Sequence, residues 1–368
     1  MTKIGLNKKI SLSVRSPKTA INVLGDKAFG IKKNKFPRVI DLFVTEACNF
    51  ACPMCHVKES REKKNKIGGL NFDHIKKIIE ESKKHSPTFQ IIGGEPTLYK
   101  YILETIQLIN DNRMISGLTT NGLLLEKYAL GFVDSGLNFL AISLDGWDEE
   151  SQKKRGNVPG SFDKIIKGIE KVIKLRGKNN FPNIRVATVI TKNNYKDLEK
   201  IGQVLKDLNI DTWSISNYYF APNKILSEVD GFYKKTNIGA DIWADKVGEG
   251  NYFTSEDVET LKKQLGIIKK LDTRFKIDYD WSIDLDKYYS LSIPSSDSVC
   301  IVPYNEIFIR GNGDLELCQA YKLGNIAIDK IEDVWQGDKI KYFRKVFEEN
   351  KMMPACFRCC ALNAKFDK

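Results

Sequence analysis

Short apolar runs alternate with longer amphipathic stretches through the first 217 residues of the chain. The runs are rich in Ile, Val, Leu and Phe, as expected for strands that are covered on both faces of a parallel sheet. The stretches between them, of which 72–85 is the first, repeat their apolar residues at helical spacing. The predicted strands are 38–45, 89–92, 115–118, 142–146, 184–190 and 212–216. This alternation predicts an α/β fold, a partial (β/α)6 TIM-like barrel that is open rather than closed.

The alternation stops after residue 217. A predicted helix, 255–271, and an aromatic-rich stretch, 275–289, follow, and we expect this part to bridge two domains and to line a substrate pocket. From residue 300 the pattern indicates a strand, a Gly-Asn-Gly-Asp turn, a second strand and a helical stretch over 331–349. The predicted division is a basic N-terminal extension (1–37), the barrel (38–217), the bridging segment (218–299) and a small C-terminal β-hairpin-plus-helix domain (300–368).

The chain is basic, with 58 Lys and Arg against 47 Asp and Glu. Because the lysines are spread along predicted helices without a dense Arg-aromatic patch, an ordinary solvated surface is favoured over a nucleic-acid site. Attraction to an anionic substrate stays open. No run approaches the roughly 18 apolar residues that a membrane helix needs, and no signal-like stretch opens the chain. We therefore expect a cytoplasmic protein with no membrane span.

Three of the eight cysteines directly follow the first predicted strand, spaced as Cys48-x3-Cys52-x2-Cys55. Thiolates are soft ligands that suit iron-sulfur or zinc chemistry. His56 is too near Cys55 in sequence to complete the same tetrahedron comfortably, which argues against a closed zinc site of three cysteines and one histidine. The other histidines are His74 and His85. A 4Fe-4S cluster on three cysteines would instead leave one iron open to an external ligand.

This spacing resembles the signature of the radical S-adenosylmethionine (radical SAM) superfamily. The segments Gly-Gly-Glu-Pro at 93–96, Thr-Thr-Asn-Gly at 119–122 and Ile-Ser-Leu-Asp-Gly at 142–146 resemble further motifs of that family, in the same order. Each lies at the end of a predicted strand. The motifs would therefore gather at the carboxyl edge of one parallel sheet, where α/β folds build their sites.

The resemblance implies that Cys48, Cys52 and Cys55 hold a 4Fe-4S cluster that binds SAM. In the family, the GGEP backbone and glutamate hold the SAM amino group, a serine and an arginine approach its carboxylate and ribose, and an apolar residue covers the adenine. The residues at the cofactor-binding positions are Gly93, Gly94, Glu95, Pro96, Thr119, Asn121, Ser143, Arg155 and Val189. Met54 departs from the family pattern, which usually has an aromatic residue there, although a thioether can also pack against a purine.

The other five cysteines all follow residue 299. Such clustering argues for a second metal site, since cysteines used only as small core residues would be scattered. The arrangement resembles the twitch domain, a shortened SPASM domain, which implies one auxiliary 4Fe-4S cluster on Cys300, Cys318, Cys356 and Cys359, with Cys360 left over. A four-cysteine zinc site fits the same spacing and stays open. A reducing compartment disfavours disulfides.

The resemblance also implies a reaction. Reductive cleavage of SAM, fed by a partner such as ferredoxin or flavodoxin, would give a 5′-deoxyadenosyl radical that takes hydrogen from a substrate C–H bond. An auxiliary cluster could accept the leftover electron, which favours a two-electron oxidation or bond formation on a peptide or protein. The alternatives are dehydrogenation or redox-neutral rearrangement of a sugar, aminocyclitol or lipid precursor, and a non-enzymatic iron-sulfur electron carrier.

An oxidation of this kind would need a base. Asp278 and Asp280, followed by Asp284, have the even spacing that would place them on one face of a strand. We expect this strand in the bridging segment, where Asp278 and Asp280 are the candidate bases. An exposed polar face is the alternative.

Overall fold

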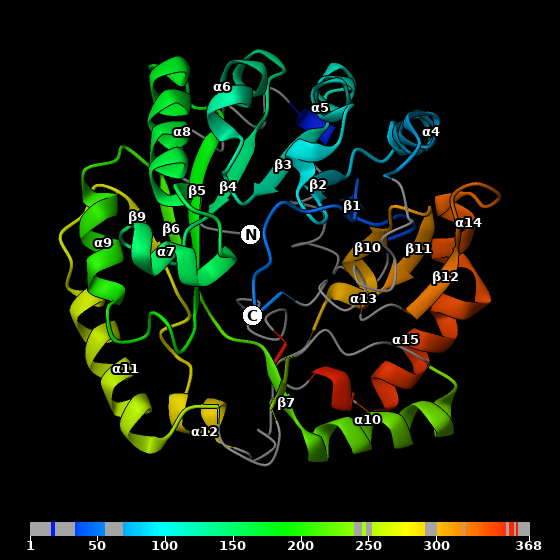
Figure 1. Ribbon diagram of the computed structural model, residues 1–368. Helices are drawn as coiled ribbons and strands as arrows, with labels where there is room; N and C mark the ends of the chain where they lie inside the picture. The colour runs from blue at the N-terminus through cyan, green and yellow to red at the C-terminus, as the bar shows by residue number, and fades with distance from the viewer. Residues whose placement is uncertain are drawn as a thin grey trace.

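The computed structural model describes residues 16–18, 34–55, 69–238, 245–247, 252–290, 300–318, 321–350, 353–356 and 358–359. Most of the predicted N-terminal extension, together with Cys360, lies outside these ranges. A ten-stranded sheet organises the described part of the chain, in the order β12-β11-β10-β1-β2-β3-β4-β5-β6-β9 (Figure 1). From β10 to β9 every neighbouring pair of strands is parallel.

The strands of the sheet are short, and a separate parallel pair lies outside it. The sheet strands are β1 (Val39–Phe43), β2 (Thr88–Ile92), β3 (Ile115–Thr120), β4 (Phe139–Ser143), β5 (Asn183–Ile190), β6 (Thr212–Asn217), β9 (Lys276–Asp278), β10 (Glu306–Ile309), β11 (Asp314–Leu317) and β12 (Tyr321–Asn325). The separate pair is β7 (Phe220–Pro222) and β8 (Asp245–Val247).

Helices follow the strands as the alternation predicts. They are α4 (Phe72–Ser82), α5 (Ile102–Asp111), α6 (Leu125–Asp134), α7 (Glu149–Gly156), α8 (Ser161–Arg176), α9 (Leu198–Lys206), α10 (Asn223–Thr236), α11 (Ser255–Lys269), α12 (Leu285–Tyr289), α13 (Val302–Asn305), α14 (Ile331–Gln336) and α15 (Asp338–Asn350), with 3-10 turns η2 (Pro96–Leu98) and η3 (Pro354–Cys356). None of these described helices has the length and apolar character to cross a membrane.

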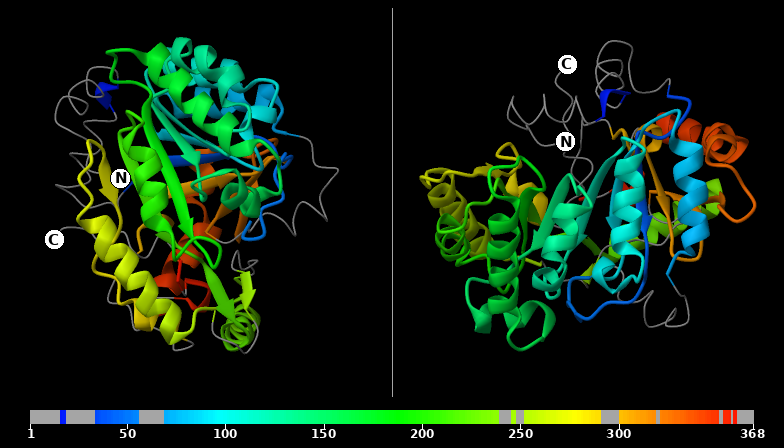
Figure 2. Two further views of the ribbon diagram at one scale, coloured as in Figure 1. Left: turned by 60° about the vertical axis from the view of Figure 1, so that its left-hand side comes forward. Right: turned by 90° about the horizontal axis from the view of Figure 1, so that it is seen from above.

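The sheet has an outer and an inner face. Helices α4, α5, α6 and α8 stand along the outer face (Figures 1 and 2). Along β5, the fully buried Ile184 and Val186 belong to the main core, and they alternate with the half-buried Arg185 and Ala187 on the inner face. The inner face therefore carries side chains that are only partly covered, and this is the face on which a site can form.

The predicted α/β partial barrel is confirmed, and the sheet extends it at both edges. Strand β9 adds beside β6, and the C-terminal hairpin joins the same sheet because β10 pairs with β1 in parallel. The three residues of β9, Lys-Ile-Asp, form no apolar run that periodicity could detect. The helix predicted over 331–349 is two helices, α14 and α15, because Gly337 lies between them in an extended conformation.

Candidate active site

The cysteine loop, residues 44–55, leaves the carboxyl end of β1 and is fixed to the neighbouring motifs by its backbone. The amide of Gly94 donates to the Thr45 carbonyl (2.8 Å), and that of Glu95 donates to the Ala47 carbonyl (2.7 Å). On the other side, the Ala51 amide donates to the carbonyl of Gly156, at 3.4 Å. The loop that carries Cys48, Cys52 and Cys55 therefore lies directly against the Gly-Gly-Glu-Pro segment and the end of α7.

Two of these contacts require glycine. A Cβ on Gly94 would lie 2.2 Å from the Ala47 carbonyl oxygen, and one on Gly156 would lie 2.3 Å from the Phe50 ring. Both separations are far below van der Waals contact, so the chain approaches this closely only without side chains. Gly93 is also special, because its φ of +147° falls in a region that other residues rarely adopt.

The Glu95 carboxylate is 1% exposed and its hydrogen bonds come from within the protein. Its Oε1 accepts from the amide (3.0 Å) and hydroxyl (2.7 Å) of Thr97 and from the hydroxyl of Thr120 (2.7 Å). Its Oε2 accepts from the Asn121 amide (2.7 Å). The side chain thus ties the ends of β2 and β3 together. The contact of this segment with the SAM amino group stays a prediction.

Asn121 links the end of β3 to the cysteine loop. Its Nδ2 donates to Asn49 Oδ1 (2.7 Å) and lies 4.0 Å from Cys48 Sγ. The Phe50 amide also donates to Cys48 Sγ (3.4 Å). Hydrogen bonds to sulfur set the potential of a cluster that the sulfur holds, so the surroundings of Cys48 fit an iron-sulfur ligand.

Arg155 lies between the cysteine loop and the end of β4. Its Nε is 2.8 Å from the buried Asp145 Oδ2, and its side chain reaches the Cys52 thiol. Burial raises the pKa of Cys52, whereas Arg155 lowers it and the neighbouring Cys55 and Cys48 raise it. The three thiols are therefore near enough to influence one another. The sequence analysis missed Asp145, although it lies within the Ile-Ser-Leu-Asp-Gly segment.

The remaining predicted cofactor residues surround the same sheet edge. Thr119 is exposed on the inner face, and Ser143 is half-buried at the end of β4. The amide of Val189 donates to Asp145 Oδ1 (2.8 Å). Met54 is half-buried against the main core, and Pro96 begins the 3-10 turn η2.

Three of the C-terminal cysteines lie close together, and one of them, Cys318, directly follows β11. Burial raises the pKa of Cys318 well above its usual value, and Cys356 and Cys300 raise it further, so these three thiols are neighbours. The amide of Cys359 donates to the Cys356 carbonyl (3.0 Å), so a single turn of the chain joins these two residues. As they stand, no three His, Cys, Asp or Glu side chains among the described residues could hold a single metal ion. The ligand assignments at both cysteine sets therefore stay predictions.

A buried ionic cluster joins the cysteine loop to the hairpin. Arg310, in the turn after β10, places its Nη2 3.3 Å from Glu46 Oε1 and its Nε 3.7 Å from Glu316 Oε2. Its guanidinium also lies over the Phe43 ring, 4.0 Å from the centroid. Since Glu46 and Glu316 each come two residues before a cysteine, Cys48 or Cys318, Arg310 connects the two cysteine sets through charge and packing.

The prediction that Asp278, Asp280 and Asp284 share one face of a strand was wrong. Strand β9 ends at Asp278, because Asp280 turns the chain by accepting from the amide (3.0 Å) and hydroxyl (2.5 Å) of Ser282. Asp284 instead caps α12, where it accepts from the Lys287 amide (3.1 Å).

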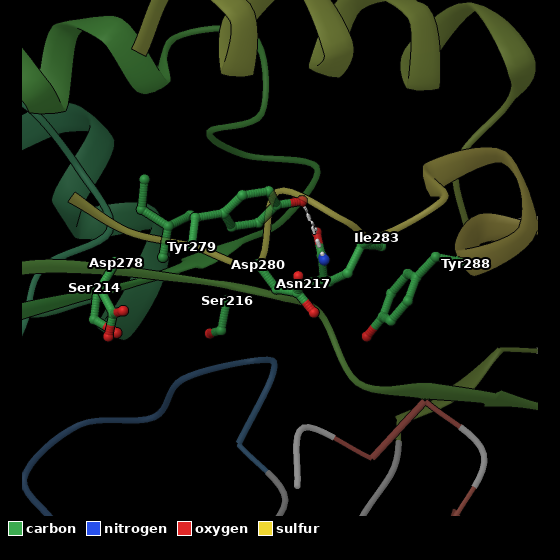
Figure 3. Close-up of a pocket in the computed structure, with 9 residues that line it drawn as sticks. Ser214, Ser216, Asn217, Asp278, Tyr279, Asp280, Ile283 and Tyr288 are labelled. Carbon is green, nitrogen blue, oxygen red and sulfur yellow. Dashed lines mark hydrogen bonds between the residues drawn. The ribbon is translucent and has the colours of Figure 1, made fainter. Parts of the chain in front are cut away.

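Asp278 and Asp280 nevertheless line one hollow of about 270 Å³ on the inner face (Figure 3). Its lining residues are Ser214, Ile215, Ser216, Asn217, Asp278, Tyr279, Asp280, Ile283 and Tyr288. The Tyr279 hydroxyl and the Asn217 side chain are 3.3 Å apart. The sequence analysis missed the serines of β6. The available signal was the alternation of Ser214 and Ser216 with the apolar Trp213 and Ile215.

Two protein-family models match this chain, one over the barrel and one over the C-terminal domain. The model of the radical SAM superfamily matches residues 42–205, and that of the SPASM iron-sulfur cluster-binding domain matches residues 300–360. A probable GTP 3′,8-cyclase of Methanococcus aeolicus is 30% identical over 220 residues, which are 56% of this chain and 71% of that protein. The chain belongs to the radical SAM superfamily.

Two further proteins are similar over most of this chain at lower identity. A molybdenum cofactor biosynthesis protein of Caenorhabditis elegans is 25% identical over 311 residues, 83% of this chain and 47% of that one. The chain spans about half the length of the first curated relatives that it matches. Among solved structures, Streptococcus suis SuiB bound to the precursor peptide SuiA is similar in fold, with a TM-score of 0.60 and 17% identity over 94% of this chain and 74% of that one.

As a radical SAM enzyme with a SPASM domain, the protein uses SAM, a SAM-binding 4Fe-4S cluster and an auxiliary iron-sulfur cluster. Membership in this superfamily favours the enzyme over the alternative of an electron carrier. The matched ranges contain the cysteines of both sets, with Cys360 at the end of the second range.

Proposed function

We propose that this radical SAM enzyme removes hydrogen from a C–H bond of a peptide or protein, in a two-electron oxidation or bond formation. The observation that carries the proposal is that one inner sheet face adjoins both cysteine sets. Strand β1, which leads into the first set, pairs directly with β10, and β11 ends at the residue before Cys318. A substrate on this face would lie between a radical source and an electron acceptor.

The residues of the chain have separate tasks in this proposal. Cys48, Cys52 and Cys55 hold the SAM-binding cluster, and Cys300, Cys318, Cys356 and Cys359 hold the auxiliary cluster. When bound, SAM and its cluster supply a 5′-deoxyadenosyl radical. The protein orients the substrate and excludes water. A ferredoxin or flavodoxin supplies the electron.

Asp280 is the better candidate for the base that takes the substrate proton. Its Oδ1 is held by Ser282, and its carboxylate points to the same side of the hollow as the hydroxyls of Ser216 and Tyr288 (Figure 3). Asp278 is the weaker candidate for the base, because its Oδ1 lies 3.1 Å from the cationic Lys276 Nζ. A fixed carboxylate at the substrate pocket is what a general base requires.

Two observations support a peptide substrate over a small molecule. The hollow of about 270 Å³ is close to the lower limit of the roughly 300–1,000 Å³ that small-molecule pockets span, and it has room for one amino-acid side chain. The similar structures include SuiB with a precursor peptide and anSMEcpe with the Cp18Cys peptide. The relatives named as GTP 3′,8-cyclases favour the alternative, a small-molecule reaction.

Deuterium transfer tests the proposal. The reconstituted enzyme, SAM and dithionite would be incubated with size fractions of a fully deuterated extract from the organism that encodes the chain. The deuterium content of the 5′-deoxyadenosine formed would then be measured by mass spectrometry. We expect deuterium in the 5′-deoxyadenosine when the fraction contains peptides and proteins. The D280N variant should still form labelled 5′-deoxyadenosine but should not form the oxidised product. A label only with molecules below about 1 kDa would instead support the small-molecule reaction.

A further inference from the structure

The inner face of β5, β6 and β9 carries a band of charged and hydroxyl side chains. Register places Arg185, Thr212 and Lys276 in one row across the three strands. The next row toward the carboxyl edge is Ala187, Ser214 and Asp278. Because alternate residues of a strand share a face, Arg185 and Lys276 lie directly beneath the hollow that Ser214 and Asp278 line.

Asp278 is the carboxylate that both cations face. Lys276 Nζ lies 3.1 Å from Asp278 Oδ1, and the two side chains are 39% and 32% exposed. Burial lowers the pKa of Arg185, and the charge of Asp278 raises it. The carboxylate therefore lies close to two cations of the inner face, which lie one row below the residues that line the hollow.

Two neighbouring carboxyl groups lie on another part of the inner face, beside the hairpin. Asp41 of β1 and Glu306 of β10 lie on neighbouring strands, and burial followed by the charge of Glu306 raises the pKa of Asp41 well above its usual value. Because a raised pKa favours the neutral carboxyl, Asp41 adds little negative charge to the inner face, whereas Arg185 and Lys276 place two cations beside β9.

We propose that Arg185 and Lys276 form a binding site for an oxyanion group of the substrate, a carboxylate or a phosphate, with the hydroxyls of Ser214 and Ser216 as further donors. This inference rests on the proposed function, because it places the substrate in the hollow. A guanidinium presents paired N–H donors that match either oxyanion, and an ammonium adds a point charge. Asp278 is then a positioning residue that occupies the two cations until the substrate arrives.

Calorimetric titration of the anaerobic, reconstituted enzyme tests this site. The probes are inorganic phosphate and glutarate, with glycerol as the neutral comparison. At least one oxyanion should bind saturably and glycerol should not. Binding should weaken at least tenfold in R185Q/K276Q, or in the single variants if the double variant does not hold its clusters. K262Q, which removes an exposed lysine of α11 that pairs with Glu259 and Asp286, should bind like wild type.

The variant D278N separates binding from a merely structural role. If Asp278 competes with the oxyanion for the two cations, D278N should bind the probe several-fold more tightly. Phosphate alone would assign the site to phosphorylated substrates, and glutarate alone to carboxylates. No saturable binding to wild type, or equal binding to R185Q/K276Q, would overturn the proposal. Formation of 5′-deoxyadenosine with dithionite alone tests the radical chemistry separately, so its failure would count against the proposed function and not against this site.

Discussion

Replacing Glu95 with glutamine tests what its carboxylate does. The carboxylate oxygens accept from two backbone amides, those of Thr97 and Asn121, one on each oxygen. A glutamine side chain has one acceptor oxygen and one N–H₂ donor. Whichever way the amide is turned, its donor faces one of the two backbone N–H groups. The E95Q variant therefore always leaves one buried amide without an acceptor.

The cost follows from that geometry. A buried donor without a partner costs about 1–3 kcal/mol, and a hydrogen bond to a charged acceptor contributes about 1.5–3 kcal/mol, so the free energy of unfolding should fall by roughly 2–4 kcal/mol. For 368 residues, with an unfolding entropy of about 2 cal/mol/K per residue, this corresponds to a fall in Tm of about 3–5 °C.

Thermal unfolding followed by circular dichroism, beside SAM affinity measured by equilibrium dialysis, is the assay. E170Q is the matched control, because Glu170 is exposed on α8 and should leave Tm unchanged. SAM affinity of E95Q should stay within about threefold of wild type, since a threefold change is less than 1 kcal/mol. An unchanged Tm together with SAM binding weakened more than tenfold would contradict this prediction and would show that the carboxylate binds SAM instead of joining two strands.

Three further predictions concern the framework of the site. G94A should lose about half of the bound iron, because the new Cβ would lie 2.2 Å from a backbone oxygen of the cysteine loop. The control G231A, whose Cβ meets nothing within 4 Å, should lose no iron, and iron analysis of both variants tests this. R310M should lower the free energy of unfolding by about 3–5 kcal/mol in urea titrations, since it leaves two buried carboxylates without their cation, and a change below 1 kcal/mol would contradict this. Burial raises the pKa of Asp257, but hydrogen bonds from Lys192, Tyr195 and Thr254 outweigh burial and lower this pKa well below its usual value. The ionised carboxylate therefore stabilises the fold fully above about pH 5, and this stabilisation is lost as the pH falls below about 4. The Tm difference between wild type and D257N should therefore be present at pH 7 and shrink in acid, and a difference that grows in acid would disprove the assignment.

The local sequence was sufficient for strands such as β1 and β2, whose residues are mostly apolar. It was not sufficient for β9, whose three residues Lys-Ile-Asp are part of a strand only because β6 offers them a free edge. The pairing of β10 with β1 joins segments more than 260 residues apart, and no local pattern reports such a contact.

The candidate site, like the fold, could be predicted from the sequence only in part. The cysteine spacing and the Gly-Gly-Glu-Pro segment are local patterns, and the structure brings them into direct contact. The partners of Glu95 and Arg155 could not be predicted, because they depend on which donors from other strands surround each buried charge. Asp280 shows the reverse case: its even spacing from Asp278 suggested a strand, but the hydrogen bonds from Ser282 end it.

Counting iron and sulfide after anaerobic reconstitution, on wild type and on the variant C48A/C52A/C55A, determines whether the chain holds two clusters. We expect about eight irons per chain in wild type and about four in the variant, which corresponds to a SAM-binding 4Fe-4S cluster on the first cysteines and an auxiliary one on the C-terminal set. About four irons falling to none, with zinc in the C-terminal site, would contradict this expectation, because the proposed oxidation would then have no electron acceptor.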